Sequence, residues 1–210
     1  MNYLAHLYLA DPTPESLMGN LIADIVKGSD LSHLTLGVEQ GVRLHRRVDS
    51  FTDSHPVVHR SIRRISARWG WYSGILMDVY FDHILATKWN RWSDVPLRTF
   101  VDRIHGSLTQ SIDLAPEGGR EMIGKLIETD RLYSYSTAEG IHEALFHLSR
   151  RIRERMPERD IHLEQAMPDL QANLPALTED FEFFFPDLIQ YAKTIKEKLG
   201  IKSDQKAPHG

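Results

Sequence analysis

The stretch LGVEQGVRLHRRVD, residues 36–49, decides the class of fold, because its polar and apolar positions repeat with a helical period. Four of its residues follow one another at spacings of four, three and four: Val38, Val42, His45 and Asp49. Such spacings place all four side chains on one face of an α-helix. An imidazole and a carboxylate therefore continue a line that two valines begin, and we expect both polar groups to face inward.

Similar periods, separated by Pro and Gly, run along the rest of the chain, and neither a sustained two-residue alternation nor an Asn-Gly hairpin turn predicts strands. The predicted helices begin at or near Thr13, Leu36, Ser54, Trp71, Pro96, Met122 and Ser136. Gly28 is placed to end the first of them, and Ser136 with Glu139 has the spacing of a capping box before the last. We expect an all-α fold, a single compact helical domain over residues 1–201, followed by a flexible tail over 202–210.

Composition narrows the function classes. With 25 Lys and Arg against 29 Asp and Glu, the net charge of −4 argues against a nucleic-acid-binding protein. The absence of Cys excludes disulfides, thiolate zinc sites and cysteine nucleophiles, so His, Asp, Glu or water must hold any metal. No segment approaches the roughly 20 apolar residues that span a bilayer, and the N-terminal stretch lacks a basic signal-peptide region. We expect a soluble, cytoplasmic protein without a membrane partner.

Charge is segregated along the chain. Residues 160–192 contain seven acidic residues and no Lys or Arg, whereas residues 43–68 contain seven Arg. Two solvated faces of opposite sign and a binding surface for a charged partner explain this equally well.

Several ionisable residues lie on or beside the apolar stripes of three predicted helices. These residues are Asp24 in the first, His45 and Asp49 in the second, and Asp78, Asp82 and His83 in the fourth. A buried ionised carboxylate costs several kcal/mol unless it is paired or bound to a metal, so the coincidence needs a shared explanation. A divalent cation supplies one, and a mixed imidazole and carboxylate shell suits manganese, iron, zinc or magnesium better than calcium.

The competing explanation is a network in which Arg residues pair with these carboxylates. His6 is open to two interpretations, either a further polar group of the site or a packed histidine. Nucleophilic alternatives are weaker, because the chain has no Gly-x-Ser-x-Gly elbow, no phosphate-binding Gly-x-x-x-x-Gly-Lys loop and no dinucleotide fingerprint.

Four blocks in order resemble bacterial acyl carrier protein phosphodiesterases. They are MNYLAHL at 1–7, GNLIAD at 19–24, HRRVD at 45–49 with TD at 52–53, and DVYFDH at 78–83. The likeness extends more weakly through FFFP at 183–186. This family is itself regarded as a distant relative of the HD phosphohydrolases, so the resemblance implies a distorted HD-like helical bundle. The chain has no adjacent His-Asp pair and only the reversed Asp82-His83.

The resemblance implies hydrolysis of the phosphodiester that joins 4′-phosphopantetheine to a serine of holo-acyl carrier protein. It also implies a divalent ion, Mn²⁺ or alternatively Mg²⁺, Fe²⁺ or Co²⁺. The expected ligands are His45, Asp78, Asp82 or His83, Asp24 and Asp49, with Asp24 alternatively acting as the general base. Arg46 or Arg47 would offset charge on the phosphoryl oxygens. The acidic carrier protein would bind to Arg47, Arg60, Arg63 and Arg64.

Two other hypotheses compete with this one. The first keeps the metal site and changes the substrate to a nucleotide or another small phosphoester. The second is a metal-free helical adaptor that binds an acidic partner through its Arg surface; it predicts that Asp24, His45 and Asp82 are held in Arg pairs or hydrogen bonds.

Overall fold

The computed structural model describes residues 1–201, and every regular element within that range is a helix. The α-helices are α1 (Tyr3–Leu9), α2 (Pro14–Ile22), α3 (Leu36–Ser54), α4 (Pro56–Trp69), α5 (Ser73–Thr87), α6 (Leu97–Gln110), α7 (Glu117–Glu128), α8 (Arg131–Ser134), α9 (Ala138–Arg155), α10 (Met167–Ala172) and α11 (Leu174–Lys198). Short 3-10 helices cover Gly70–Tyr72, Trp89–Arg91, Ile112–Leu114 and Leu163–Ala166. The all-α prediction is confirmed, and the predicted tail at 202–210 lies outside the described residues.

The start of α2 follows its sequence signals, but its end does not. The Thr13 side chain accepts a hydrogen bond from the Ser16 amide at 3.3 Å, and Pro14 takes the first helical position. The helix then ends at Ile22, and Gly28 adopts its positive φ of 81° in the loop beyond. The prediction that this helix continues to Gly28 is wrong, because the chain leaves the helix six residues earlier and turns toward α3.

The N-terminus of α9 is capped one residue later than the capping-box spacing predicts. Thr137, and not Ser136, accepts the amide hydrogen of Gly140 at 3.1 Å. The Ser136 hydroxyl instead donates to the carbonyl oxygen of Tyr133. Ser and Thr are both strong N-cap residues, so the sequence does not distinguish Ser136 from Thr137. The path of the preceding turn determines which of them caps the helix.

Helices α2 and α3 pack unusually closely, and two glycines make this possible. A Cβ atom on Gly19 would lie 2.2 Å from the Val38 carbonyl oxygen and 2.9 Å from the Gly41 Cα. A Cβ atom on Gly41 would lie 2.6 Å from the Ser16 carbonyl oxygen. Because only glycine fits at this crossing, α3 is fixed against α2 with backbone touching backbone.

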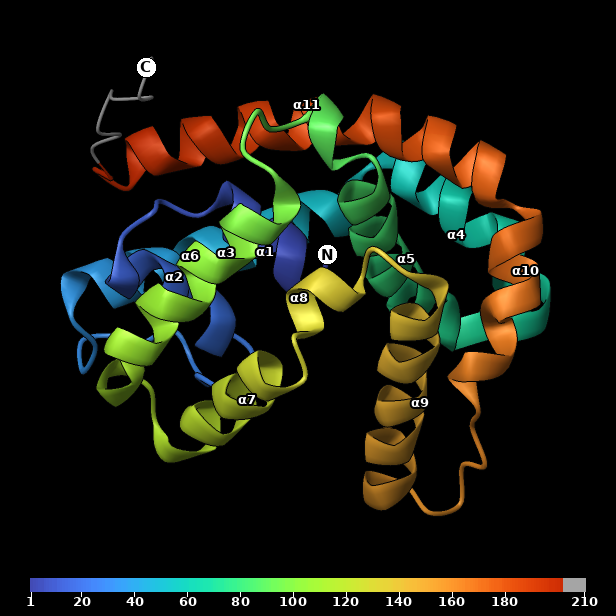
Figure 1. Cartoon of the computed structure of the whole chain (residues 1–210), viewed down its shortest axis with the longest axis horizontal. Coiled ribbons are helices and arrows are strands. Elements are labelled where there is room, and N and C mark those ends of the chain that lie inside the picture. Colours follow the sequence, from blue (N-terminus) through green and yellow to red (C-terminus); the bar gives the residue numbers. More distant parts are fainter. Residues whose placement is uncertain (202–210) are drawn as a thin grey trace.

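The long helix α11 extends across the molecule and packs against α3 and α4, while α9 stands at the opposite side (Figure 1). The buried side of α11 includes Phe181, Phe184 and Phe185, which belong to the main core. Pro186 lies within this helix and is exposed. No described helix has the length and apolar character needed to cross a membrane.

The segregated charges meet inside the fold. The Asp180 side chain on α11 is 1% exposed and accepts hydrogen bonds from Arg60 at 2.8 Å, from Arg64 at 3.0 Å and from the Ser61 hydroxyl at 2.8 Å. Asp169 likewise accepts hydrogen bonds from Arg68 and from the Trp69 indole, and Glu182 pairs with Arg91. Much of the acidic stretch therefore neutralises the protein's own arginines.

Candidate metal centre

Two histidines from different helices stack against each other near the middle of the molecule. His6 lies on α1 and His45 on α3, and their ring centroids are 3.8 Å apart with planes only 13° from parallel. Both side chains are buried. The close crossing of α2 and α3 fixes the helix that carries His45, while α1 contacts both α2 and α5.

Asp49 joins the two imidazoles. Its Oδ1 lies 3.0 Å from His6 Nε2, and its Oδ2 lies 3.0 Å from His45 Nε2. The spacing of four residues on α3 brings Asp49 beneath His45, as the sequence predicts. Candidate ligand atoms of these three residues all fall within 4.8 Å of one another. They form the one such group of three or more His and acidic residues in the part of the chain that the structure describes.

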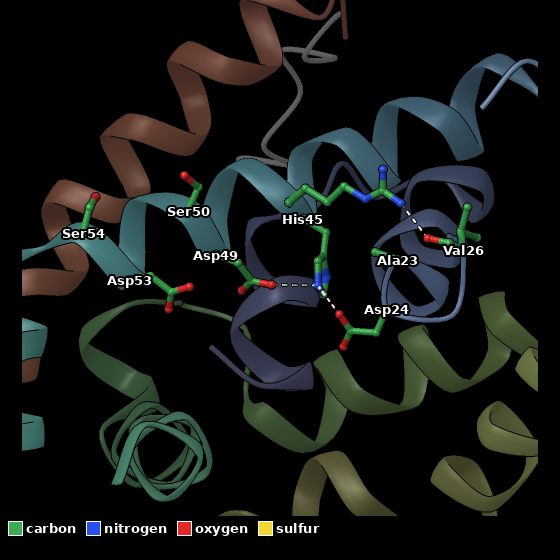
Figure 2. A pocket seen from close by; sticks show the side chains of 9 residues that line it. Ala23, Asp24, Val26, His45, Asp49, Ser50, Asp53 and Ser54 are labelled. Carbon is green, nitrogen blue, oxygen red and sulfur yellow. Dashed lines mark hydrogen bonds and ion pairs between the residues drawn. The ribbon is translucent and has the colours of Figure 1, made fainter. Parts of the chain in front are cut away.

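Asp24 completes the surroundings of His45 from the other side. Its Oδ1 lies 3.4 Å from His45 Nε2, so two carboxylates flank one ring nitrogen (Figure 2). The position of Asp24 beside the apolar stripe of the first predicted helix predicts partial burial; this prediction is wrong, because its side chain is 80% exposed. Since α2 ends at Ile22, Asp24 lies beyond the helix and projects from a turn into the pocket.

The ring nitrogens offer a direct test of whether these residues fit a metal ion. His45 Nδ1 and Nε2 and His6 Nδ1 are buried without a hydrogen-bond partner among the described residues. The carboxylate oxygens near His45 Nε2 are close enough to hydrogen-bond with it, but they do not lie in the direction that a hydrogen bond requires. Buried polar atoms without partners are rare in proteins, and a cation shared by imidazole and carboxylate would satisfy His45 Nε2, the nitrogen that the carboxylates approach. The donor set therefore fits a divalent metal.

The N-terminal ammonium group adds a fixed positive charge beside this cluster. The Met1 nitrogen is buried and lies 3.0 Å from Asp78 Oδ1 and 3.5 Å from Asp49 Oδ1. Burial acts to lower its pKa, but the carboxylates of Asp78 and Asp49 outweigh burial and raise the pKa to about 10. Asp78, on α5, therefore lies at the edge of the site, because the Met1 nitrogen that it binds also contacts Asp49.

The histidines differ in their protonation behaviour. Burial, reinforced by the neighbouring His45, lowers the pKa of His6 to about 4, which keeps its imidazole neutral. Burial also acts against a charge on His45, but the nearby carboxylates of Asp24 and Asp49 raise its pKa to about 9. Burial opposes ionisation of Asp49 too, yet the two histidines and the N-terminal ammonium hold its pKa far below the usual range. When no metal cation is bound, a proton on His45 supplies the positive charge between the two carboxylates.

Four predicted ligands lie outside the three-residue cluster: Asp24 and Asp78 border it, whereas backbone groups hold Asp82 and His83. Asp82 is fully buried, and its two oxygens accept the amide hydrogens of Leu4 at 2.7 Å and Ala5 at 3.1 Å. Burial raises its pKa to about 7 despite these hydrogen bonds. His83 directs Nδ1 to the Tyr135 carbonyl oxygen at 2.7 Å. Asp82 thus fixes the start of α1, which carries His6, and His83 fixes the α8 region.

The predicted arginines fall into three groups. Arg46 lines the pocket and donates to the carbonyl oxygens of Val26 at 2.6 Å and Gly28 at 2.7 Å. Arg60 and Arg64 are bound to Asp180, as described above. Arg47 and Arg63 are exposed, and no ion pair holds either side chain within residues 1–201.

An open pocket of about 640 Å³ gives access to the cluster. Its lining residues are Ala23, Asp24, Val26, His45, Arg46, Asp49, Ser50, Asp53 and Ser54. His45 and Asp49 form its floor, so a substrate entering the pocket would meet the candidate ligands directly (Figure 2). The structure brings Asp24, His45 and Asp49 together and places His6 against His45.

Comparisons with known proteins point to one family. The family model for acyl carrier protein phosphodiesterase matches residues 1–188. A protein of this name from Pectobacterium atrosepticum is 33% identical over 195 residues, which cover 92% of this chain and 98% of the relative. Another from Salmonella agona is 32% identical over 193 residues, covering 91% of this chain and 97% of that protein. No solved structure matches the chain.

Proposed function

The chain belongs to the acyl carrier protein phosphodiesterase family, and on this premise we propose that it hydrolyses the phosphodiester between 4′-phosphopantetheine and a serine of holo-acyl carrier protein. The products are the apo-protein and 4′-phosphopantetheine. The observation that carries the proposal is the cluster of His6, His45 and Asp49, within the segment that the family model matches. Two of its residues, His45 and Asp49, line an open pocket.

We propose Mn²⁺ as the ion, with His6, His45 and Asp49 as its ligands. A bound divalent ion supplies polarisation of a water molecule and offsets negative charge on the phosphoryl oxygens. Neutral imidazole and carboxylate suit Mn²⁺, and also Mg²⁺, Fe²⁺ and Co²⁺, better than they suit Ca²⁺. Asp24 and Asp78 lie at the edges of the cluster, at 3.4 Å from His45 and 3.0 Å from the N-terminal nitrogen. The predicted ligands Asp82 and His83 are held by backbone groups instead.

The remaining polar groups of the pocket position the substrate and the attacking water. Asp24 is exposed, lines the pocket and adjoins His45, so its carboxylate is placed to accept a proton from water. Arg46 is anchored by the carbonyl oxygens of Val26 and Gly28, which holds its guanidinium at the pocket wall before substrate arrives. A cation held in this way stabilises charge that develops on phosphoryl oxygens without first reorganising.

The test follows the intact mass of the carrier protein. Metal-stripped protein is incubated with holo-acyl carrier protein, with and without added Mn²⁺, and conversion to the apo mass is expected only with the ion. His45→Ala and His6→Ala should lose both the conversion and the bound Mn²⁺ measured by equilibrium dialysis. His33→Ala removes an exposed imidazole outside the pocket and should behave like the wild type.

Two outcomes would contradict the proposal in different ways. Bound Mn²⁺ without any change in carrier mass would exclude this substrate and direct the search to nucleotides and other small phosphoesters. An absence of metal binding would exclude the metal centre itself and favour the adaptor hypothesis.

A further inference from the structure

A third acidic side chain continues the row that holds His45 and Asp49. Asp53 lies four residues beyond Asp49 on α3 and lines the same pocket. Figure 2 shows His45, Asp49 and Asp53 projecting from one side of the helix, whereas Ser50 and Ser54 point away from that side. The family resemblance and the metal cluster leave this carboxylate without a function.

Asp53 differs from Asp24 and Asp49 in its partners. Its backbone carbonyl oxygen accepts a hydrogen bond from His59 Nε2 at 2.6 Å. Its carboxylate makes no hydrogen bond or ion pair with any residue from 1 to 201. It is therefore a carboxyl group in a pocket that neither stabilises the fold through a salt bridge nor belongs to the cluster of candidate ligands.

Hydrolysis of this phosphodiester needs a proton donor as well as a nucleophile. As the bond between phosphorus and the serine Oγ breaks, its electron pair moves to the oxygen, and an aliphatic alkoxide is a poor leaving group without a proton. The attacking and leaving oxygens lie roughly in line on opposite sides of phosphorus. A donor must therefore stand across the phosphoryl group from the attacking water.

Helix geometry sets Asp53 apart from the candidate ligand Asp49 while keeping it in the same pocket. A rise of 1.5 Å per residue separates the backbone positions of Asp49 and Asp53 by about 6 Å along α3, which leaves room for a phosphoryl group. Other polar groups of the pocket are less suited to donate this proton, because Asp24 adjoins His45 and Arg46 is bound to carbonyl oxygens. Ser50 and Ser54 are directed elsewhere.

We propose that Asp53 is the general acid of the reaction, donating its carboxyl proton to the serine oxygen as the phosphorus–oxygen bond breaks. This inference rests on the proposed function. Water forms the new bond to phosphorus and gives a proton to Asp24, while Asp53 gives a proton to the leaving serine oxygen. Exchange with solvent then removes the proton from Asp24 and returns one to Asp53, so atoms and charge balance.

The surroundings of Asp53 favour this function. Although Asp53 is exposed, its partial desolvation in the pocket raises its pKa, and the carboxylates of Asp78 and Asp49 raise it further, against the lowering effects of the Met1 ammonium and His59. An anionic phosphodiester bound beside Asp53 would also raise its pKa, as the two carboxylates do. These are the charged groups that act on Asp53 from α3, α4, α5 and the N-terminus.

The experiment compares Asp53→Asn with the wild type on esters whose leaving groups differ in basicity. We expect the variant to lose about 10²- to 10⁴-fold in kcat on holo-acyl carrier protein, the usual contribution of a general acid. On bis(4-nitrophenyl) phosphate, whose leaving group departs without a proton, the loss should be only a few-fold. Across a series of aryl methyl phosphates, the rate of the variant should fall more steeply with leaving-group pKa than the rate of the wild type.

The controls separate this inference from the proposed function. Asp94→Asn makes the same change at an exposed aspartate outside the pocket and should leave all rates unchanged, and Mn²⁺ binding should be equal in all three proteins. Equal losses on good and poor leaving groups, or no loss at all, would overturn the general-acid assignment. A wild type that cleaves aryl esters but not holo-carrier protein would overturn the proposed function, while the aryl series would still decide the function of Asp53.

Discussion

His45 connects the site to the pH dependence of stability. The pKa of its buried imidazole is raised to about 9 by Asp24 and Asp49 against the effect of burial, whereas its ordinary value is 6.5. A raised folded-state pKa contributes stability that is fully present below pH 6.5 and is lost as the pH rises through 9. For the metal-free protein this loss amounts to about 3 kcal/mol, since one pKa unit corresponds to about 1.4 kcal/mol.

Urea unfolding of the metal-free protein between pH 6 and pH 9.5 measures this effect. His45→Gln should show a smaller decrease in unfolding free energy across that range than the wild type. The variant also controls for the N-terminal ammonium, whose pKa of about 10 produces its own decrease at the upper end. Identical slopes in both proteins would show that His45 is not protonated in the folded state.

For individual residues, sequence spacing predicts contacts within one helix but not contacts between helices. His45 and Asp49 could be paired because four residues on α3 fix their relation. Asp82 follows the same rule on α5, but which group it meets depends on where α1 docks, and it meets two backbone amides. His6 could not be assigned for the same reason, because its stacking partner is 39 residues away in the chain.

The crossing of α2 and α3 determines the position of the helix that carries His45, Asp49 and Asp53. Gly19→Ala would place a methyl group 2.2 Å from the Val38 carbonyl oxygen, so the helices must separate. We expect a loss of about 3 kcal/mol in unfolding free energy, at the upper end of overpacking effects, and weaker Mn²⁺ binding.

Gly106→Ala on α6 is the matched control for this substitution. Nothing lies within 4 Å of the Cβ that it would introduce. It should therefore stabilise the protein by about 0.5 to 1 kcal/mol through helix propensity. Chemical denaturation of both variants checks the prediction, and a neutral Gly19→Ala would contradict the close crossing.

Asp180 joins α11 to α4, and its removal leaves three donors without their acceptor. Asp180→Ala should lower the unfolding free energy by about 3 kcal/mol, because Arg60, Arg64 and Ser61 all lose a partner that is 1% exposed. Asp187→Ala on the same helix removes a carboxylate that is 66% exposed and should change stability by less than about 0.5 kcal/mol. Equal stability of the two variants in urea would contradict this account.

The whole molecule has a net charge of −4, yet two arginines near α3 and α4 remain available to an acidic partner. Arg47 and Arg63 are exposed and unpaired within residues 1–201, unlike Arg60 and Arg64. Reversing both to Glu should lower kcat/KM for the carrier protein by about tenfold at low salt, and the difference should shrink as salt is added.

The control for this prediction changes net charge equally at exposed arginines on other helices. Arg103→Glu with Arg155→Glu, on α6 and α9, should leave kcat/KM close to the wild-type value. An equal decrease in both double variants would indicate an effect of net charge alone and would exclude a localised binding surface.

The charge pattern also shows where sequence interpretation reaches its limit. The acidic and basic segments were visible from composition, and an internal explanation and an external one fitted equally well. Only the packing of α11 against α4 shows that Asp180 and Arg60, 120 residues apart, meet within the protein. The position of α11 itself was not predicted, because Pro186 interrupts the pattern from which a continuous helix is recognised.

The packing of α11 has a consequence for the order in which the chain is synthesised. Every residue of the metal cluster belongs to the first 49, whereas the helix that covers α3 and α4 does not begin until Leu174. While the intervening segment is being translated, the faces of α3 and α4 that α11 covers have no permanent cover, a state in which nascent chains aggregate or recruit chaperones. The candidate ligands are therefore made early, and the scaffold that holds them in place is completed only near the end of translation.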